Sequence, residues 1–258
     1  MEKYKKRNLI TWIITGCVAL AILLTVCFKF VYIDRSIGDF WVRMYVDKCY
    51  ILGTTTQGNN QRYLIIPEKI KGRKVEYLGT PRSPLAIVGK IKRAEIESDK
   101  IEKVFFETSD IGVHVNTFDD CSRLKKIFAI RGEINHVQTN LYYTYKYFMT
   151  HIKISDFNAT YNNFHTKPAN VSYNYNFNGA ENDGYYWIDD YDYGSKIEFI
   201  PPEPKRKGYT FGGWYKEPEC KNKWNFETDV LPEERTEINE EGEEEVVYQE
   251  TKLYAKWV

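Results

Sequence analysis

The C-terminal part of the chain contains the segment Lys207-Gly-Tyr-Thr-Phe-Gly-Gly-Trp-Tyr215, in which glycines are interspersed with large aromatic residues. Tyr209 and Phe211 have the two-residue spacing that puts side chains on one face of a strand, and glycine permits tight turns and close backbone approach. Two later tryptophans, Trp224 and Trp257, add more apolar surface. These rings are large enough to fill a small core, so the segment predicts a β-rich module.

This part of the chain resembles the internalin-type B-repeat, also called the Listeria-Bacteroides repeat. The resemblance covers residues 169–258 and implies a small β-grasp-like sheet with one helix, a secreted or surface protein, and no catalytic residues. The acidic stretch Glu233–Glu250 departs from the family, and we predict a solvated loop there. Five blocks occur in the family's order: Lys207–Tyr215, Glu219-Cys220, Trp224-Asn-Phe226, Asp229 and Leu253-Tyr-Ala-Lys-Trp257.

An uncharged run, Leu9–Phe28, lies near the start of the chain. As a helix with a rise of about 1.5 Å per residue, it would span about 30 Å, the thickness of a bilayer core. The basic cluster Lys3–Arg7 precedes the run, whereas only Lys29 and Arg35 follow it closely. The length of the run predicts one retained membrane anchor, and the positive-inside rule puts its N-terminus in the cytoplasm and its C-terminus outside the cell. With the resemblance to the B-repeat, this implies a bacterial plasma membrane.

Two alternatives to a retained anchor stay open. A cleaved signal peptide usually has a shorter apolar core and a small-residue cleavage site, which Thr25-Val-Cys27 matches poorly. A lipoprotein signal is indicated by Ile14-Thr-Gly-Cys17, although the uncharged run continues well beyond the cysteine.

Between the anchor and the module, short strand patterns occupy residues 29–168. Apolar and polar residues alternate in part of Ile37–Ile51, which predicts one strand. Thr54–Asn60 has the composition of a turn. Two short strands are then predicted at Tyr63–Ile66 and Lys74–Leu78.

A weak internal repeat follows these strands. Ile101–Phe106 resembles Leu124–Ile130, which begins 23 residues later, inside the window of about 20–29 residues that is typical of leucine-rich repeats. Ile91–Ile96 and His151–Phe157 are predicted as further rungs. Because one rung cannot bury its apolar face alone, the rungs must stack, and a stack offers a repeated, fairly flat surface.

Two blocks in this region resemble BspA-like leucine-rich repeats. They are Leu64-Ile-Ile-Pro67 with Gly72–Gly79, and Phe118–Leu124. The resemblance covers residues 40–157, but Thr117 stands where the family favours alanine, and the rungs are few and uneven. It implies a short, irregular solenoid.

We therefore predict a mainly β chain with some α-helix. Its four parts are a cytoplasmic basic tail (1–8), a transmembrane anchor (9–28), a degenerate leucine-rich-repeat region (29–168) and a B-repeat module (169–258).

Charge and cysteine content exclude several classes of protein. Without residues 1–28, the chain has 32 basic and 35 acidic residues, so there is no electrostatic case for nucleic-acid binding. Cys49, Cys121 and Cys220 are widely spaced and odd in number, so no disulfide framework is implied. Small buried apolar positions are predicted for all three.

The sequence has no recognisable catalytic, cofactor or metal motif. Asp189–Gly194 lacks the ligand spacing of a calcium loop, and we predict a solvated turn there. No nucleophile elbow or phosphate-binding glycine loop is present. We therefore predict no enzyme, no cofactor and no metal. The histidines also lack metal-ligand spacing: His114, His136, His151 and His165.

A binding role is the function that we predict, with cell-wall polymer, a glycan or a protein as partner. Residues 68–103 hold ten basic residues against six acidic ones, and the densest aromatic cluster follows at 142–148. A structural spacer or envelope scaffold is the alternative, and an uncharacterised enzyme ranks third. The oligomeric state stays open. The candidate partner-binding residues are Lys71, Arg73, Lys74, Tyr142, Tyr143, Tyr145 and Tyr147.

Overall fold

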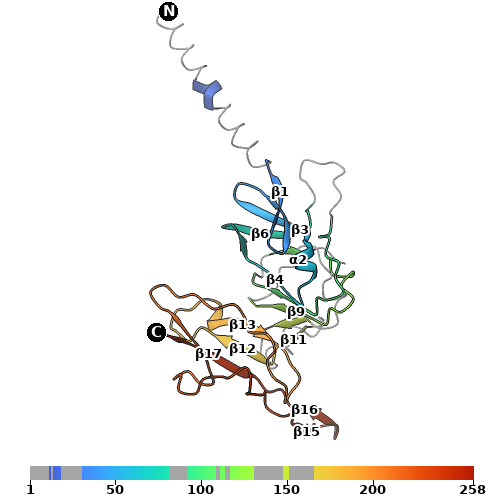
Figure 1. The fold of residues 1–258 in the computed structure, drawn as a ribbon, viewed down its shortest axis with the longest axis vertical. Coiled ribbons are helices and arrows are strands. Elements are labelled where there is room, and N and C mark those ends of the chain that lie inside the picture. The colour runs from blue at the N-terminus through green and yellow to red at the C-terminus, as the bar shows by residue number, and fades with distance from the viewer. Residues whose placement is uncertain are drawn as a thin grey trace, which may run out of the picture.

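The computed structural model describes residues 12, 14–18, 31–81, 92–108, 111–113, 117–130, 148–150 and 166–258. Residues 12 and 14–18 are helical and lie at the N-terminal end of the molecule (Figure 1). No helix among the described residues is long and apolar enough to cross a membrane. Most of the predicted anchor, Leu9–Phe28, lies outside the described residues, so the anchor stays a prediction.

The described part of the chain is mainly β, as predicted, and its strands form three main sheets and a hairpin. The first sheet has the order β1-β2-β3-β6-β5, with β8 beside β6. The second has the order β11-β10-β9-β7-β4, and the third β13-β12-β17-β14. The first sheet lies nearest to the N-terminal helical residues in Figure 1, and the third lies at the opposite end.

The first sheet comprises strands β1 (Ile33–Ile37), β2 (Phe40–Met44), β3 (Lys48–Thr54), β5 (Lys69–Ile70), β6 (Arg73–Leu78) and β8 (Gly112–Val113). The second comprises β4 (Tyr63–Ile66), β7 (Lys103–Phe106), β9 (Lys126–Ala129), β10 (Phe148–Thr150) and β11 (Thr166–Pro168). The third comprises β12 (Val171–Asn174), β13 (Tyr185–Asp189), β14 (Phe211–Tyr215) and β17 (Thr251–Trp257).

The segment Ile37–Ile51 differs from its prediction as a single strand. It contributes to three antiparallel strands, because the chain reverses after Ile37 and Ile37 pairs with Phe40 across a two-residue turn. Gly38 opens that turn at φ +56°, a conformation that glycine adopts without strain. The predicted turn after β3 contains one helical turn, α2 (Thr56–Asn59). The Thr55 hydroxyl caps α2 by accepting the Gly58 N–H at 3.3 Å.

The second sheet is parallel throughout, and it aligns the repeat seen in the sequence. Val104 in β7 lies opposite Ile127 in β9, at the 23-residue spacing of the repeat. The other neighbours are spaced differently, since Tyr63 of β4 lies opposite Lys103 of β7, 40 residues later in the sequence. The stack of strands is therefore uneven, and its assignment to the leucine-rich repeats stays a proposal.

The further rungs predicted at Ile91–Ile96 and His151–Phe157 are not confirmed. Lys92 and Glu95, within the predicted rung Ile91–Ile96, form single bridges to Thr80 and Gly53 of the first-sheet region instead of extending the parallel sheet. Gly53 permits this close approach, because a Cβ there would lie 2.4 Å from the Glu95 carbonyl oxygen. The rung predicted at His151–Phe157 lies outside the described residues, and β10 supplies the strand next to β9.

Strand β7 is buried on both faces, so the molecule has three layers. Val104 and Phe106 pack in the core shared with the first sheet, whereas Phe105 packs with Trp187 in the core of the C-terminal module. Parallel strands covered on both faces have such continuous apolar runs. The face of the parallel sheet that we expected to be a flat binding surface thus lies beneath the C-terminal module.

The third sheet has a β-grasp-like order, in which the central strands β12 and β17 are parallel and the outer strands are antiparallel to them. Trp214 and Trp224 are buried, as predicted for its core. All of residues 166–258 are described, and their only helix is the short 3₁₀ turn Asn182–Gly184. The expected α-helix is absent: the connection from β13 to β14 contains Pro201, Pro202 and Pro204, which lack the N–H that a helix needs.

The acidic stretch Glu233–Glu250 is also more ordered than predicted. It forms an exposed antiparallel hairpin of β15 (Thr236–Ile238) and β16 (Glu244–Val246). Among the cysteines, Cys49 and Cys121 are buried and unpaired, as expected, whereas Cys220 is only half-buried.

Candidate interaction surface

One side of the first sheet faces away from the core. Residues of β2 alternate: Phe40, Val42 and Met44 are buried, whereas Trp41 points outward with 50% of its surface exposed. A strand with one buried face requires such alternation. We call this side the outer face, and define it by Tyr32, Asp34, Trp41, Arg43, Tyr45, Lys48, Tyr50 and Tyr77.

Four tyrosine rings form a row across the outer face. Tyr45 contacts Tyr32 and Tyr50 at centroid distances of 5.6 and 4.9 Å, and Tyr50 contacts Tyr77 at 5.4 Å. The Arg43 guanidinium lies 4.0 Å from the centroid of the Tyr32 ring. Burial raises the pKa of both Tyr45 and Tyr50, so these phenols stay neutral at physiological pH. Tyr50 is itself buried, so the aromatic surface of the row comes from Tyr32, Tyr45 and Tyr77, beside the Arg43 cation.

Beside this row lies a groove of about 620 Å³ between the first sheet and the segment 92–95. Trp41 lines it, together with Arg43, Lys92 and Arg93. Arg43 is held by two hydrogen bonds to Asp34, of 2.8 and 2.7 Å. Lys92, in contrast, forms no ion pair with any residue that the structure describes, and it is exposed. Arg93 is paired with Asp120, and the carboxylates of Asp34 and Glu95 also line the groove. The groove thus offers an indole ring and two ion-paired guanidinium groups, and Lys92 supplies an ammonium group open to a ligand.

The three basic candidate residues near this sheet have different environments. Lys71 and Gly72 form the turn between β5 and β6 with φ of 49° and 77°, and Lys71 is exposed. Arg73 is half-buried, and its Nε donates a hydrogen bond of 2.7 Å to the Tyr45 carbonyl oxygen, which ties β6 to the β2–β3 turn. Lys74 is half-buried as well. Of the three, Lys71 is the one with an exposed side chain, and Arg73 has a structural role.

The aromatic candidates lie in two different situations. Tyr142, Tyr143, Tyr145 and Tyr147 are outside the described residues, as are the four histidines. Trp214 and Trp224 of the C-terminal module are buried, so their rings cannot stack on a ligand. Trp41 was missed as a candidate, although the alternation of Phe40, Val42 and Met44 in the sequence already places it on the opposite face.

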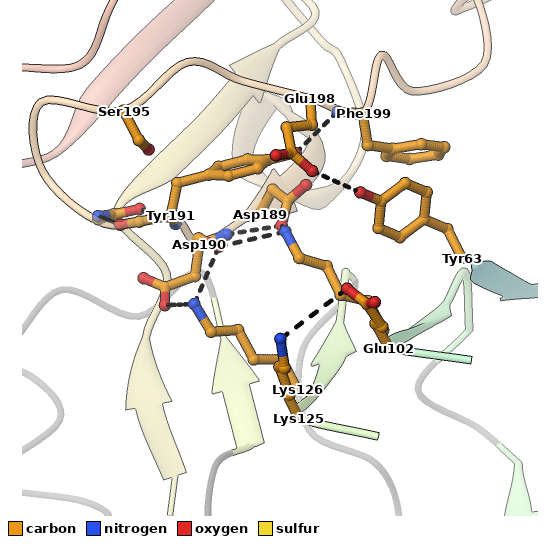
Figure 2. A network of polar contacts seen from close by, with 12 residues as sticks. Tyr63, Glu102, Lys125, Lys126, Asp189, Asp190, Tyr191, Ser195, Glu198 and Phe199 are labelled. Carbon is orange, nitrogen blue, oxygen red and sulfur yellow. Dashed lines mark hydrogen bonds and ion pairs between the residues drawn. The ribbon is translucent and has the colours of Figure 1, made fainter. Parts of the chain in front are cut away.

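A polar network joins the parallel sheet to the C-terminal module (Figure 2). Lys103 Nζ lies 2.5 Å from Asp189 Oδ1, and Lys126 Nζ lies 2.6 Å from Asp190 Oδ2. Glu198 accepts hydrogen bonds from Arg62 at 2.7 Å and from the Tyr63 hydroxyl at 3.1 Å. These contacts fix the orientation of the module on the sheet.

Asp189 corrects the prediction of a solvated turn at Asp189–Gly194. It is the last residue of β13 and is fully buried, with Lys103 as its charged partner. Burial raises the pKa of Asp189, and the nearby Lys103 ammonium opposes that shift. Burial lowers the pKa of Lys103 in turn. Within the described ranges, no three His, Cys, Asp or Glu side chains come together as a metal-binding group.

Comparison with known proteins identifies one part of the chain. Residues 170–239 match the family model of the Listeria-Bacteroides repeat domain, which confirms the B-repeat resemblance there. Strand β17 lies beyond the matched residues but pairs with β12 and β14, so it completes the sheet of this module. No curated protein and no solved structure matches the chain.

Proposed function

We propose that this chain is a single-pass bacterial surface protein that binds an anionic glycan polymer of the cell envelope through its outer face. The observation that carries the proposal is the half-exposed Trp41 ring in a groove beside Arg43, Lys92 and Arg93. The Listeria-Bacteroides repeat supports a surface location, and the uncharged run Leu9–Phe28 supports the anchor.

The chemistry of the groove favours a charged sugar over a purely apolar ligand. An indole ring offers a flat apolar face to the C–H groups of a sugar, and its polar edge tolerates water. The Arg43 guanidinium is already oriented by Asp34, so little side-chain entropy is lost when it binds an anion. Lys92 adds a cation without a partner among the described residues. A polymer of phosphate-bearing or carboxylate-bearing sugars satisfies both features.

The position of the outer face limits where such a ligand lies. Strand β1 begins at Ile33, five residues after the end of the predicted anchor at Phe28. Five extended residues span at most about 17 Å. A retained anchor would therefore hold the outer face close to the membrane surface. This short tether favours a ligand in the inner envelope over contact with another cell.

The spacer alternative also has an observation in its favour. Ion pairs at the junction of the parallel sheet and the module, such as Lys103 with Asp189, hold these two layers in one orientation. Such a body would keep its shape under load. A spacer function, however, does not require an exposed indole ring at Trp41 beside the Lys92 ammonium group, which has no ion-pair partner among the described residues.

A sedimentation assay distinguishes the two functions. The full chain, purified in detergent, is mixed with envelope fragments before and after chemical extraction of their anionic polymers. The binder is expected to sediment with intact fragments and to stay in solution with extracted ones, and Trp41→Ala is expected to abolish sedimentation. The matched control is Tyr209→Ala, because Tyr209 is also 50% exposed but lies on the C-terminal module. Equal behaviour with both kinds of fragment would favour the spacer.

A further inference from the structure

The Lys103–Asp189 pair is unusual because both side chains are removed from water. The Lys103 side chain is 11% exposed and that of Asp189 is 0% exposed. The two residues are 86 positions apart in the sequence, on β7 of the parallel sheet and β13 of the module. Any bond between them would join two layers of the molecule.

Aromatic rings surround the amino group of this pair. Lys103 Nζ lies 3.7 Å from the centroid of the Tyr191 ring, and 5.7 and 5.8 Å from those of Phe128 and Tyr63. Ring faces attract an ammonium group, but removal of both side chains from water opposes their charges, and burial accordingly lowers the pKa of Lys103 and raises that of Asp189. Relative to the ion pair, the uncharged form of the pair, an amine beside a carboxylic acid, is therefore more favoured here than it would be in water.

The Asp189 carboxyl group is held by one oxygen only. Its Oδ1 accepts hydrogen bonds from Lys103 Nζ and from the Asp190 backbone N–H, the latter at 2.7 Å. Its Oδ2 is buried and accepts no hydrogen bond from the residues that the structure describes. A buried carboxylate oxygen without a partner is costly, so the ion pair is incompletely compensated.

We propose that Lys103 and Asp189 condense to form an intramolecular amide bond. A proton first passes from the ammonium group to the carboxylate, which gives a neutral amine and a carboxylic acid. The Lys103 nitrogen lone pair then attacks Asp189 Cγ, and a C–N bond forms. A nitrogen-bound proton moves to one carboxyl oxygen, the C–O bond breaks, and one water molecule leaves. The step needs no oxidant, reductant or cofactor.

The fold supplies the two conditions that this condensation needs. The reacting groups are held in contact by two packed sheets, and such fixed proximity is worth effective concentrations of about 10⁵–10⁸ M. The Asp190 N–H donates a hydrogen bond to Oδ1, the oxygen that takes the Lys103 proton and leaves as water, and it thereby holds the carboxyl group in place for the attack. Loss of water from an apolar site then favours the amide. The inference does not depend on the proposed ligand.

Mass spectrometry of the denatured full chain tests the amide bond directly. The wild-type mass is expected to be lower than the sequence mass by one water molecule, and tryptic digestion is expected to give one branched peptide that joins Lys103 to Asp189. Lys103→Met and Asp189→Ala are each expected to restore the missing water. Lys126→Ala, which removes the neighbouring and more exposed ion pair, is expected to keep the water loss.

Two results would overturn the proposal. One is a wild-type mass equal to the sequence mass, together with ordinary tryptic cleavage after Lys103. This result does not depend on whether any variant folds. The other is a water loss that persists in Lys103→Met, since Asp183-Gly184 can lose water by closing a succinimide without any lysine.

Discussion

Phe105 and Phe128 stack nearly face to face, with ring centroids 4.6 Å apart and an angle of 10° between their planes. They occupy equivalent positions in β7 and β9, 23 residues apart, and both are fully buried. Trp187 of the C-terminal module contacts Phe105 at 5.1 Å. The sequence repeat thus produces an aromatic stack, and the module packs on that stack.

Phe128→Ala is expected to lower the free energy of unfolding by about 3–5 kcal/mol, because it removes a buried ring from the core shared by two layers. Urea denaturation of the full chain in detergent measures the change. Trp41→Ala serves as the control and is expected to stay within about 0.5 kcal/mol of the wild type, because the ring is half exposed. A loss below about 1 kcal/mol for Phe128→Ala would mean that the stack contributes little.

Trp214→Ala is expected to destabilise the C-terminal module by a similar amount, about 3–5 kcal/mol. Trp214 is buried and meets Tyr173 edge-on at 4.9 Å, so truncation leaves a cavity in the sheet's core. The same change at the exposed Tyr209 is expected to have little effect. Thermal unfolding followed by near-ultraviolet circular dichroism reports both variants. An unchanged transition for Trp214→Ala would show that its ring is not part of the core.

Lys71→Glu is expected to weaken binding to anionic envelope polymer, and to do so more at low salt than at high salt. Lys71→Asn provides the matched control: it removes the positive charge without adding a negative one, and asparagine tolerates the φ of 49° at this turn position. Its loss of binding is expected to be smaller. Sedimentation at two salt concentrations measures both. Wild-type binding by both variants at both salt concentrations would exclude this turn from the binding surface.

The Asp34–Arg43 pair is expected to stabilise the fold at neutral pH and to lose that contribution in acid, below about pH 4. The hydrogen bond from Arg43 holds the pKa of Asp34 below its ordinary value, so the pair stabilises the fold above the unfolded pKa of about 3.9. That contribution is lost as the pH falls through the lower, folded pKa. Because Asp34 is partly exposed, the effect is expected to be at most about 0.5 kcal/mol.

Urea titrations of wild type and Asp34→Asn from pH 7 to pH 2 test this dependence. The difference between the two proteins is expected to shrink to zero at the acid end. A constant difference over the whole range would assign the effect to packing instead of charge.

Local patterns in the sequence predicted local structure well. The strand predicted at Tyr63–Ile66 was confirmed, and the one predicted at Lys74–Leu78 begins one residue earlier, at Arg73. The 23-residue spacing of the repeat appears in the register of β7 and β9. Ile37–Ile51 was wrong as a single strand. Gly38-Asp39 is a two-residue hairpin signal that the prediction did not use, and the apolar alternation of β2 continues to Val46, inside the second turn.

Contacts between distant segments could not be predicted from the sequence. Asp189 lies in a run of aspartates and tyrosines typical of a solvated turn, and its burial depends on Lys103, 86 residues away. The face of the parallel strands that we expected to be exposed is covered by Trp187 and its neighbours, and this contact also joins segments that are far apart in the sequence. The outward position of Trp41 could have been predicted from the sequence, since strand alternation alone places it outside the core.

Under the proposed function, the outer face binds anionic envelope polymer through Trp41. This binding is measured by isothermal titration of purified polymer into the full chain in detergent, for wild type, Trp41→Ala and Tyr209→Ala. Trp41→Ala is expected to bind at least about tenfold more weakly, a loss of about 1.4 kcal/mol, whereas Tyr209→Ala is expected to bind like the wild type. Wild-type affinity in a folded Trp41→Ala variant would contradict the claim.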